Sequence, residues 1–185
     1  MTVIMKDAIK PNLLQTLENT PVIVHAGPFG NIAHGNSSIV GDLIGIRGGE
    51  YLITEAGFGA DMGAERFFNI KCRASGMTPD AAVLVATVRA LKAHSGKFKI
   101  TPGKALPADL LAENPDDVRA GAANLIKQIE NVKVHGVSPV VAINAFPGDY
   151  ESEHQAIREI AESVGARVAV CRNFSEGGAG ATELA

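Results

Sequence analysis

The most unusual polar segment of the 185-residue sequence runs from His25 to Ser38 and holds two His, two Asn and two Ser among glycines. It follows a short apolar run, so we expect a polar loop at the end of a strand. His34 and Asn36 could donate hydrogen bonds to a phosphate or a carboxylate, and Ser37 or Ser38 could cap a following helix. A hydrogen-bonded structural role is the alternative for each histidine. The spacing of the histidines fits no common metal-ligand pair, so we predict no metal here.

A second glycine-rich segment, from Thr54 to Phe68, carries acidic side chains and an aromatic ring. Phe58, held between glycines, indicates a stacking surface for a flat ligand, and a hydrophobic plug that packs on the core is the alternative. The acids Glu55 and Asp61 flank this flexible loop. The cations that follow, Lys71 among them, could bind a phosphate or form a solvated face. Two glycines could let backbone N–H groups approach an anion here, Gly57 and Gly59.

A third segment, Asn144–Asp149, places an aromatic ring directly after an apolar run. Pro147 restricts the backbone beside Phe146, so we expect this ring to be held rigidly at a strand end. Such a ring suits a planar ligand. Phe174, which follows the next apolar run, could form the opposite wall of the same site.

Two familiar catalytic motifs are missing from the sequence. Lys97 and Lys104 each follow a glycine, but neither is followed by Ser or Thr, so the chain has no Walker A loop. It also has no Gly-x-Ser-x-Gly nucleophile elbow. If the protein handles ATP, we expect the phosphate cradle to lie outside this chain.

Short apolar runs alternate with longer amphipathic stretches, which predicts an α/β fold with a mostly parallel sheet and flanking helices. Residues 96–116, which are rich in Pro and Gly, predict an irregular connection. Glycine clusters follow three of the expected strands, where parallel sheets bind ligands, although tight turns would also explain them. The expected strands cover residues 22–25, 50–54, 81–88, 137–143 and 167–171, and the expected helices cover 117–134 and 149–164.

Composition excludes several classes of protein. A net charge of −3 argues against a nucleic-acid or anionic-membrane binder. A hydrophobic content of 46% is too high for a disordered chain. Cys72 and Cys171 lie far apart and predict reduced thiols rather than a disulfide or zinc site. Without a membrane span or a secretory signal in the sequence, we expect a cytoplasmic protein.

Six segments spread along the whole chain share one pattern. They are Lys6-Asp-Ala-Ile-Lys-Pro11, Gly27-Pro-Phe-Gly-Asn-Ile-Ala-His-Gly35, Thr54-Glu-Ala-Gly-Phe-Gly-Ala-Asp61, Phe68-Asn-Ile-Lys-Cys-Arg73, Val85-Ala-Thr-Val-Arg-Ala-Leu-Lys92 and Val141-Ala-Ile-Asn-Ala-Phe-Pro147. Together, these segments closely resemble the formate–tetrahydrofolate ligase family, also called 10-formyltetrahydrofolate synthetase.

The resemblance implies an architecture like that of P-loop NTPases and an ATP-dependent reaction. ATP phosphorylates formate, and the formyl phosphate passes its formyl group to tetrahydrofolate. Family members work with Mg²⁺, are activated by K⁺ or NH4⁺, and assemble as homotetramers. They are much longer polypeptides, with the Walker-type loop upstream of the matched segments. We therefore expect this chain to be one α/β region of a larger multi-domain ligase, inactive in isolation. A non-catalytic folate-binding module, or a split-gene subunit whose partner supplies the phosphate loop, is the alternative.

The resemblance also assigns residues to the site. Phe146 and Pro147 match the family's folate-contacting Phe-Pro pair, and Phe174 stands where the family has a tryptophan that stacks on the pterin. Phe58 is a further folate-pocket candidate. His25 and His34 match family histidines and are the catalytic candidates. The polar loops expected near phosphate comprise Gly27, Asn31, Glu55, Gly57, Gly59 and Asp61.

Overall fold

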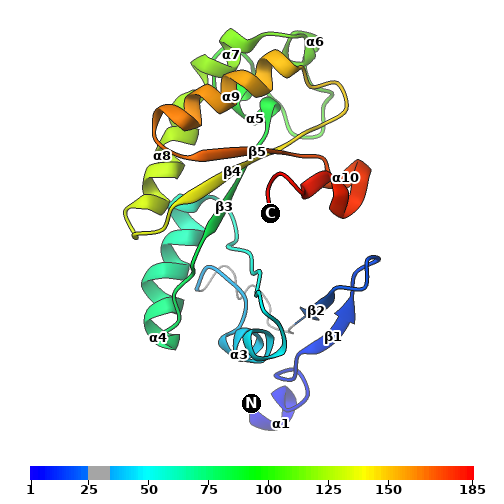
Figure 1. The fold of residues 1–185 in the computed structure, drawn as a ribbon, viewed down its shortest axis with the longest axis vertical. Helices are drawn as coiled ribbons and strands as arrows, with labels where there is room; N and C mark the ends of the chain where they lie inside the picture. The colour runs from blue at the N-terminus through cyan, green and yellow to red at the C-terminus, as the bar shows by residue number, and fades with distance from the viewer. Residues whose placement is uncertain (25–33) are drawn as a thin grey trace. The chain divides into compact units, whose positions relative to one another are not determined.

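The computed structural model describes residues 1–24 and 34–185, which gather in two compact units, Met1–Thr78 and Pro79–Ala185 (Figure 1). The first unit contains a β-hairpin and several helices, and the second contains a parallel sheet with helices packed on it. None of the helices in the described part of the chain is long and apolar enough to cross a membrane.

The hairpin of the first unit pairs β1 (Asn12–Gln15) with β2 (Pro21–Val24) in an antiparallel register. Strand β2 confirms the predicted strand as far as Val24, and His25 lies outside the described residues. The loop between the strands contains Asn19 at φ +64°, a conformation that asparagine tolerates better than most residues. Strand β1 was not predicted, because four residues flanked by polar neighbours give a weak periodic pattern.

The predicted strand at residues 50–54 is wrong. This segment forms no strand, and Tyr51 and Ile53 are exposed. Leu52 instead lies against Gly45 of helix α3 (Ile39–Gly48), where the leucine Cδ1 occupies the space beside the glycine Cα. Leu52 stays 37% exposed, so this contact covers only part of its side chain.

The remaining elements in the described part of the first unit are helical. Ser38 caps α3, accepting a hydrogen bond from the Gly41 amide at 3.0 Å, as predicted for this serine pair. The other helices are α1 (Thr2–Met5), the π-helices η1 (Ala60–Ala64) and η2 (Phe67–Cys72), and α4 (Arg73–Ser75).

The second unit confirms the predicted α/β class. Its three strands, β3 (Ala82–Ala86), β4 (Pro139–Asn144) and β5 (Arg167–Cys171), are parallel and lie in the order β3–β4–β5. The predicted strands at 81–88, 137–143 and 167–171 are confirmed within two residues, because continuous apolar runs are typical of buried parallel strands. Thr87 ends the first of them early by capping α5 (Val88–Ala93), with the Ala90 amide donating at 3.1 Å.

Helices α8 (Ala122–Lys133) and α9 (Glu151–Ser163) pack on the sheet and bury its core (Figure 1). The core includes Val141 and Ile143 from the central strand and Ile129 and Ile157 from the two helices, all essentially inaccessible to solvent. Each such side chain contributes about 1.5–3 kcal/mol by leaving water. The rest of this unit comprises α6 (Ala108–Leu111), α7 (Pro115–Ala120), α10 (Asn173–Glu176) and the 3₁₀-helix η3 (Gly177–Ala181).

The predicted helix 117–134 is two helices that meet at Gly121. A Cβ atom at this position would lie 1.8 Å from the Leu91 carbonyl oxygen, so α5 approaches the junction as closely as only glycine permits. The stretch 96–116 holds helix α6, and α7 begins within it at Pro115. Asn114 caps α7 by accepting hydrogen bonds from the amides of Asp116 and Asp117.

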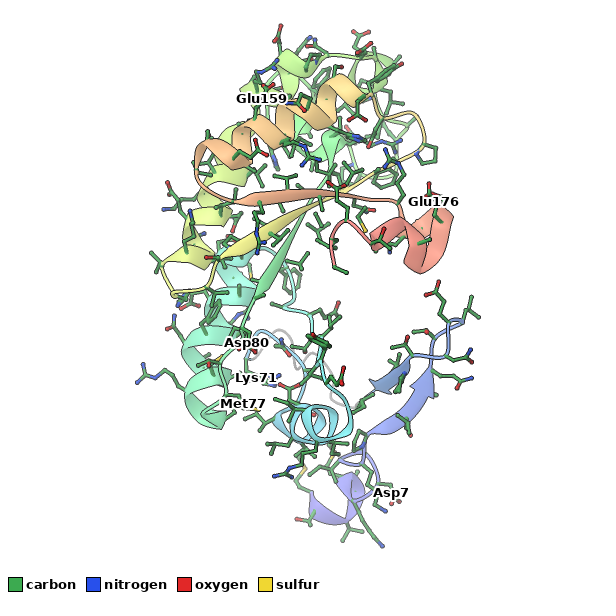
Figure 2. All side chains as sticks on the ribbon, in the orientation of Figure 1. Asp7, Lys71, Met77, Asp80, Glu159 and Glu176 are labelled. Atoms are coloured by element: carbon green, nitrogen blue, oxygen red, sulfur yellow. The ribbon has the colours of Figure 1, made fainter. Side chains whose placement is uncertain are left out.

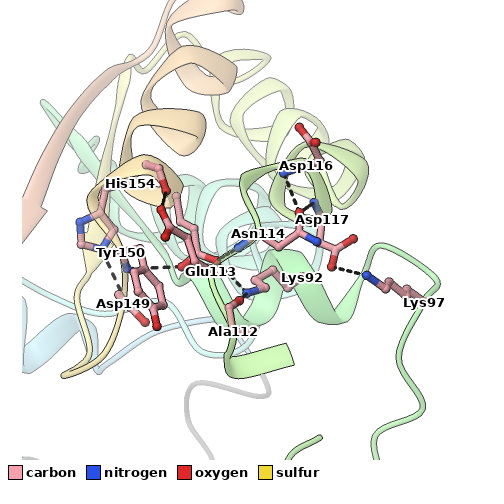
Figure 3. A network of polar contacts seen from close by, with 12 residues as sticks. Lys92, Lys97, Ala112, Glu113, Asn114, Asp116, Asp117, Asp149, Tyr150 and His154 are labelled. Carbon is pink, nitrogen blue, oxygen red and sulfur yellow. Dashed lines mark hydrogen bonds and ion pairs between the residues drawn. The ribbon is translucent and has the colours of Figure 1, made fainter. Parts of the chain in front are cut away.

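A buried ion pair joins these segments (Figure 3). Lys92 of α5 donates to Glu153 Oε1 of α9 at 2.7 Å and to the Ala112 carbonyl oxygen at 2.6 Å. The same carboxylate accepts from the Asn114 amide at 2.9 Å and, through Oε2, from the Tyr150 amide at 3.3 Å. Both side chains are at most 2% exposed. One carboxylate therefore fixes the start of α9, the end of α5 and the 112–114 segment.

We predict that Lys92→Met destabilises the second unit, because it leaves the Glu153 carboxylate buried without its cation. The expected loss is about 3–5 kcal/mol in the free energy of unfolding. The double variant Lys92→Met/Glu153→Gln should recover much of this loss, since it leaves no buried charge and the glutamine oxygen can still accept the Asn114 amide. Urea denaturation followed by circular dichroism measures both, and equal losses in the single and double variants would contradict the prediction.

We also predict that Gly121→Ala lowers the free energy of unfolding by about 1–3 kcal/mol, because the new methyl group overpacks the contact with Leu91. Gly48→Ala is the matched control: Gly48 also lies in a helix, and no atom lies within 4 Å of its added Cβ. Amide hydrogen exchange in β3 and β4 reports the local effect. Unchanged exchange in the Gly121 variant would show that α5 can move away at little cost.

Candidate functional site

The carboxyl ends of the three parallel strands form one edge of the second unit. Ala86 of β3 pairs with Ile143 of β4, and Asn144 pairs with Cys171 of β5. The Ala145 amide extends the ladder by donating to the Cys171 carbonyl oxygen at 3.0 Å. The loops that follow the strands therefore leave the sheet side by side. Parallel sheets bind ligands at this edge, where loops converge.

The loop after β4 holds Phe146 in a defined turn. The Phe146 amide donates to Asp149 Oδ2 at 2.9 Å, and the Asp149 amide donates back to the Phe146 carbonyl oxygen at 3.0 Å. Gly148 sits at φ +92° between them, a conformation that glycine adopts without strain. The Phe146 ring is 40% exposed, and the Arg89 guanidinium lies 4.5 Å from the ring centroid. The predicted rigid aromatic ring at a strand end thus has contacts that would hold it.

His154 lies behind this turn, in the first turns of α9 (Figure 3). Its Nε2 is 3.6 Å from Asp149 Oδ2, and its Nδ1 is 3.7 Å from Glu151 Oε2. The side chains of His154 and Asp149 are 5% and 4% exposed, whereas Glu151 is exposed. Asp149 therefore faces the Phe146 amide on one side and an imidazole on the other.

Phe174 lies in α10, just beyond β5, and is 90% exposed. The chain turns back after it, because the Arg172 amide donates to the Gly180 carbonyl oxygen at 2.8 Å. Glu183 then reaches the sheet, accepting from the Val170 amide at 3.0 Å and pairing with Arg158 at 3.3 Å. The segment after Phe174 thus folds back onto β5, with the Gly180 carbonyl oxygen making the contact.

In the first unit, the loop residues are organised around the buried side chain of Asn36. Its Oδ1 accepts from Thr54 Oγ1 and from Lys71 Nζ, both at 2.7 Å, and from the Ser37 amide. Lys71, which comes from η2 (Figure 2), is 2% exposed and pairs with Asp42 of α3 at 2.6 Å. Neither Asn36 nor Lys71 is thereby available to solvent. Their positions instead join the 35–37 segment to the loop that begins at Thr54.

That loop carries Phe58 in a rare backbone conformation. Phe58 has φ +66° and its ring is 66% exposed, so it is not the hydrophobic plug that the alternative describes. A non-glycine residue at positive φ is strained by roughly 1–3 kcal/mol. The Gly57 amide donates to the Gly35 carbonyl oxygen at 2.9 Å, which anchors the loop. Gly63 packs directly on Gly57, and an added Cβ there would lie 1.7 Å from the Gly57 carbonyl oxygen.

The predicted site residues form two groups, one within each unit. Phe146, Pro147 and Phe174 share one sheet edge in the second unit. In the first unit, His34 is half-buried beside the Asn36 network, Glu55 and Asp61 are exposed, and Gly59 precedes η1. The predicted site residues His25, Gly27 and Asn31 lie outside the described residues.

Sequence reasoning missed three residues around Phe146, namely Arg89, Asp149 and His154. Asp149 could have been found, because an acid three residues after an aromatic residue, across Pro-Gly, is a turn pattern. Arg89 and His154 had no such signal. They come close to the loop only through the pairing of β3 with β4 and the packing of α9.

Two shifts in pKa accompany these contacts. Burial raises the pKa of the Cys72 thiol, an effect that the neighbouring Lys71 ammonium opposes and the Asp42 carboxylate reinforces. The hydrogen bond from Arg119 lowers the pKa of the Glu159 carboxyl on the outer face of α9 (Figure 2).

Both cysteines are free thiols. Within residues 1–24 and 34–185, no three His, Cys, Asp or Glu side chains gather closely enough to hold a metal ion.

Comparison with known proteins gives one family. The family model described as formate–tetrahydrofolate ligase matches residues 1–185. The chain is 74% identical to a formate–tetrahydrofolate ligase of Saccharopolyspora erythraea over 185 residues, which are 100% of this chain and 33% of that protein. It is 65% identical to the ligase of Cutibacterium acnes and 58% identical to that of Chloroflexus aurantiacus, again over its whole length and covering 33% and 32% of those proteins. The chain therefore spans about a third of the length of these curated relatives. On the full-length family match and these identities, the chain belongs to the formate–tetrahydrofolate ligase family.

Proposed function

We propose that this chain is a segment of an ATP-dependent ligase that forms 10-formyltetrahydrofolate from formate and tetrahydrofolate, and that it supplies the folate-stacking surface. The observation that carries this proposal is the Phe146 turn at the carboxyl ends of β4 and β5. There, Asp149 holds the backbone and Arg89 lies against the ring. A pterin is a flat, polar ring system, and an immobilised aromatic side chain stacks on such a ring with little entropic cost.

The proposed reaction proceeds through formyl phosphate. Formate oxygen takes the γ-phosphoryl group of ATP, and the amine of tetrahydrofolate then attacks the formyl carbon as phosphate leaves. Because acyl phosphates hydrolyse readily, the site has to exclude water, which apolar walls such as Phe146, Pro147 and Phe174 would do. Stacking would also hold the amine against the formyl carbon.

The polar loops of the first unit belong to the same proposal. We assign six residues to polar loops near phosphate, namely Gly27, Asn31, Glu55, Gly57, Gly59 and Asp61. Phe58 is assigned to the folate pocket, and His25 and His34 are the catalytic candidates. The strained backbone of Phe58 supports a functional role, since strain of this kind concentrates at ligand sites. The homotetramer, Mg²⁺ and the K⁺ or NH4⁺ activator belong to the whole enzyme, and no residue described above is assigned to a cation.

The second candidate is a folate-binding module without catalysis of its own. The absence of a Walker A loop from the 185 residues favours it for the isolated chain, because that loop is the main phosphate cradle expected for the ATP-dependent step. A split enzyme, in which a second polypeptide supplies that loop, is a form of the same candidate.

We predict that the purified chain binds tetrahydrofolate and that Phe146→Ala weakens this binding by about tenfold or more, because the stacking surface is lost. Isothermal titration calorimetry measures the affinity. Val134→Ala is the control, since Val134 is an exposed apolar side chain directly after α8. Circular dichroism verifies that each variant is folded. A folded wild-type chain that does not bind tetrahydrofolate would contradict a self-sufficient folate site in these residues.

We further predict that the purified chain forms no 10-formyltetrahydrofolate from ATP, formate and tetrahydrofolate, since it has no phosphate loop. The assay measures product by its absorbance after acid conversion. The matched control is the full-length relative from Saccharopolyspora erythraea under the same conditions. Product formation by the pure chain would show that these residues carry a phosphate site of another kind.

A further inference from the structure

Two contacts hold Phe146, one to its ring and one to its backbone amide. The Arg89 guanidinium lies over the ring at 4.5 Å from the centroid, while the Phe146 amide donates to Asp149. Arg89 follows β3 and Asp149 follows β4, so the ring is fixed from two neighbouring strand ends. A guanidinium plane stacked on an aromatic ring occupies one face of that ring. Phe146 as a whole is still 40% exposed, so it keeps surface that a ligand could contact.

The Asp149 carboxylate is the central contact on the backbone side. It is 4% exposed, and a carboxylate buried to this degree needs hydrogen-bond donors or a counter-charge. The Phe146 amide supplies one donor at 2.9 Å, and the His154 imidazole faces the same Oδ2 atom from 3.6 Å. His154 itself is 4% exposed, and it also faces the carboxylate of Glu151. Neither ring nitrogen makes a hydrogen bond of ordinary geometry, so the imidazole supports Asp149 by packing against it.

We propose that Asp149, backed by His154, and Arg89 are positioning residues for tetrahydrofolate. They hold the Phe146 ring so that Arg89 covers one face and the pterin stacks on the other. This inference rests on the proposed function, because it concerns the stacking of that same substrate. The guanidinium strengthens the arrangement, since a cation on one face of a ring restricts the ring while leaving its other face accessible.

An alternative arrangement would reverse the effect of Arg89. If the guanidinium occupied the face that the pterin needs, the ligand would have to displace it, and removing Arg89 would tighten binding. If Arg89 supports the ring from behind, removing it weakens binding. The sign of the change in affinity therefore separates the two arrangements.

The experiment compares paired substitutions that remove or retain one contact. Asp149→Ala removes the acceptor for the Phe146 amide, whereas Asp149→Asn keeps an acceptor oxygen. Arg89→Met removes the planar cation, and Arg89→Lys keeps only its charge. His154→Ala removes the group behind Asp149, and His154→Gln replaces it with a neutral donor. Glu159→Gln is the control, since it changes an exposed charge on α9 that has no contact with the loop.

Two proteins carry these substitutions. In the 185-residue chain, calorimetry gives the dissociation constant for tetrahydrofolate, and amide hydrogen exchange gives the protection of the Phe146 amide. In the full-length relative from Saccharopolyspora erythraea, with its matching segment replaced by this chain, steady-state kinetics give kcat and the KM of each substrate. A merely structural role would lower the amount of active enzyme and hence kcat, without changing the KM for tetrahydrofolate alone.

We expect Asp149→Ala to raise the dissociation constant and the KM for tetrahydrofolate by about tenfold, the size of one lost charge-assisted hydrogen bond. The KM for ATP and the KM for formate should not change. Asp149→Asn should keep the dissociation constant and the KM for tetrahydrofolate near their wild-type values. Hydrogen exchange of the Phe146 amide should become faster in Asp149→Ala but not in Asp149→Asn. Arg89→Met should weaken binding, with Arg89→Lys in between, and His154→Ala should weaken it more than His154→Gln.

Unchanged tetrahydrofolate binding in Asp149→Ala, or tighter binding in Arg89→Met, would overturn the proposal while the proposed function stands. If neither wild-type protein responds to tetrahydrofolate, the proposed function itself fails, and the positioning role falls with it. The two failures are therefore distinct, because the first requires a wild type that binds.

Discussion

The buried pair of Lys92 and Glu153 is the interaction on which the second unit depends. Each side chain is at most 2% exposed, and removing two charges from water is costly unless every remaining polar contact is made. Here the Glu153 carboxylate also accepts two backbone amides, and Lys92 also binds a backbone carbonyl oxygen. The pair therefore sets the start of α9. That position in turn places His154 and Asp149, and through them the Phe146 turn, at the end of β4.

The first unit uses a buried lysine for a similar purpose. Lys71 pairs with Asp42 and also donates a hydrogen bond to Asn36 Oδ1. The same oxygen accepts a hydrogen bond from the Thr54 hydroxyl. Both units thus hold an irregular segment next to a candidate ligand site with a cation that solvent does not reach. Such networks are demanding, because a missing partner leaves a buried charge. They also hold a loop more rigidly than apolar contacts would, and a rigid loop lowers the entropic cost of binding.

Sequence alone predicted the parallel sheet well and the loops poorly. The apolar runs that became β3, β4 and β5 could be recognised because strands buried on both faces are continuously hydrophobic. The segment at 50–54 was also expected to be a strand, but it forms none, and Leu52 lies against Gly45. The helix expected over 117–134 was interrupted at Gly121 by the Leu91 carbonyl oxygen, a contact between residues thirty positions apart. For the candidate site, Phe146, Pro147 and Phe174 were predicted from local pattern, and all three follow strands of the sheet. Lys71 was expected at a phosphate or on the surface, because no sequence pattern reveals that a lysine has a buried partner.

The fold-back that follows Phe174 has a consequence for the backbone amides of β5 that do not pair with β4. Strand β5 lies at one edge of the β3–β4–β5 sheet, and an open amide on such an edge invites a strand from a neighbouring molecule. Glu183 already occupies the outward Val170 amide and is itself held by Arg158. A strand approaching β5 would have to displace an anchored anion at that point. Within the described residues, Glu183 therefore blocks strand addition to β5 at the Val170 amide.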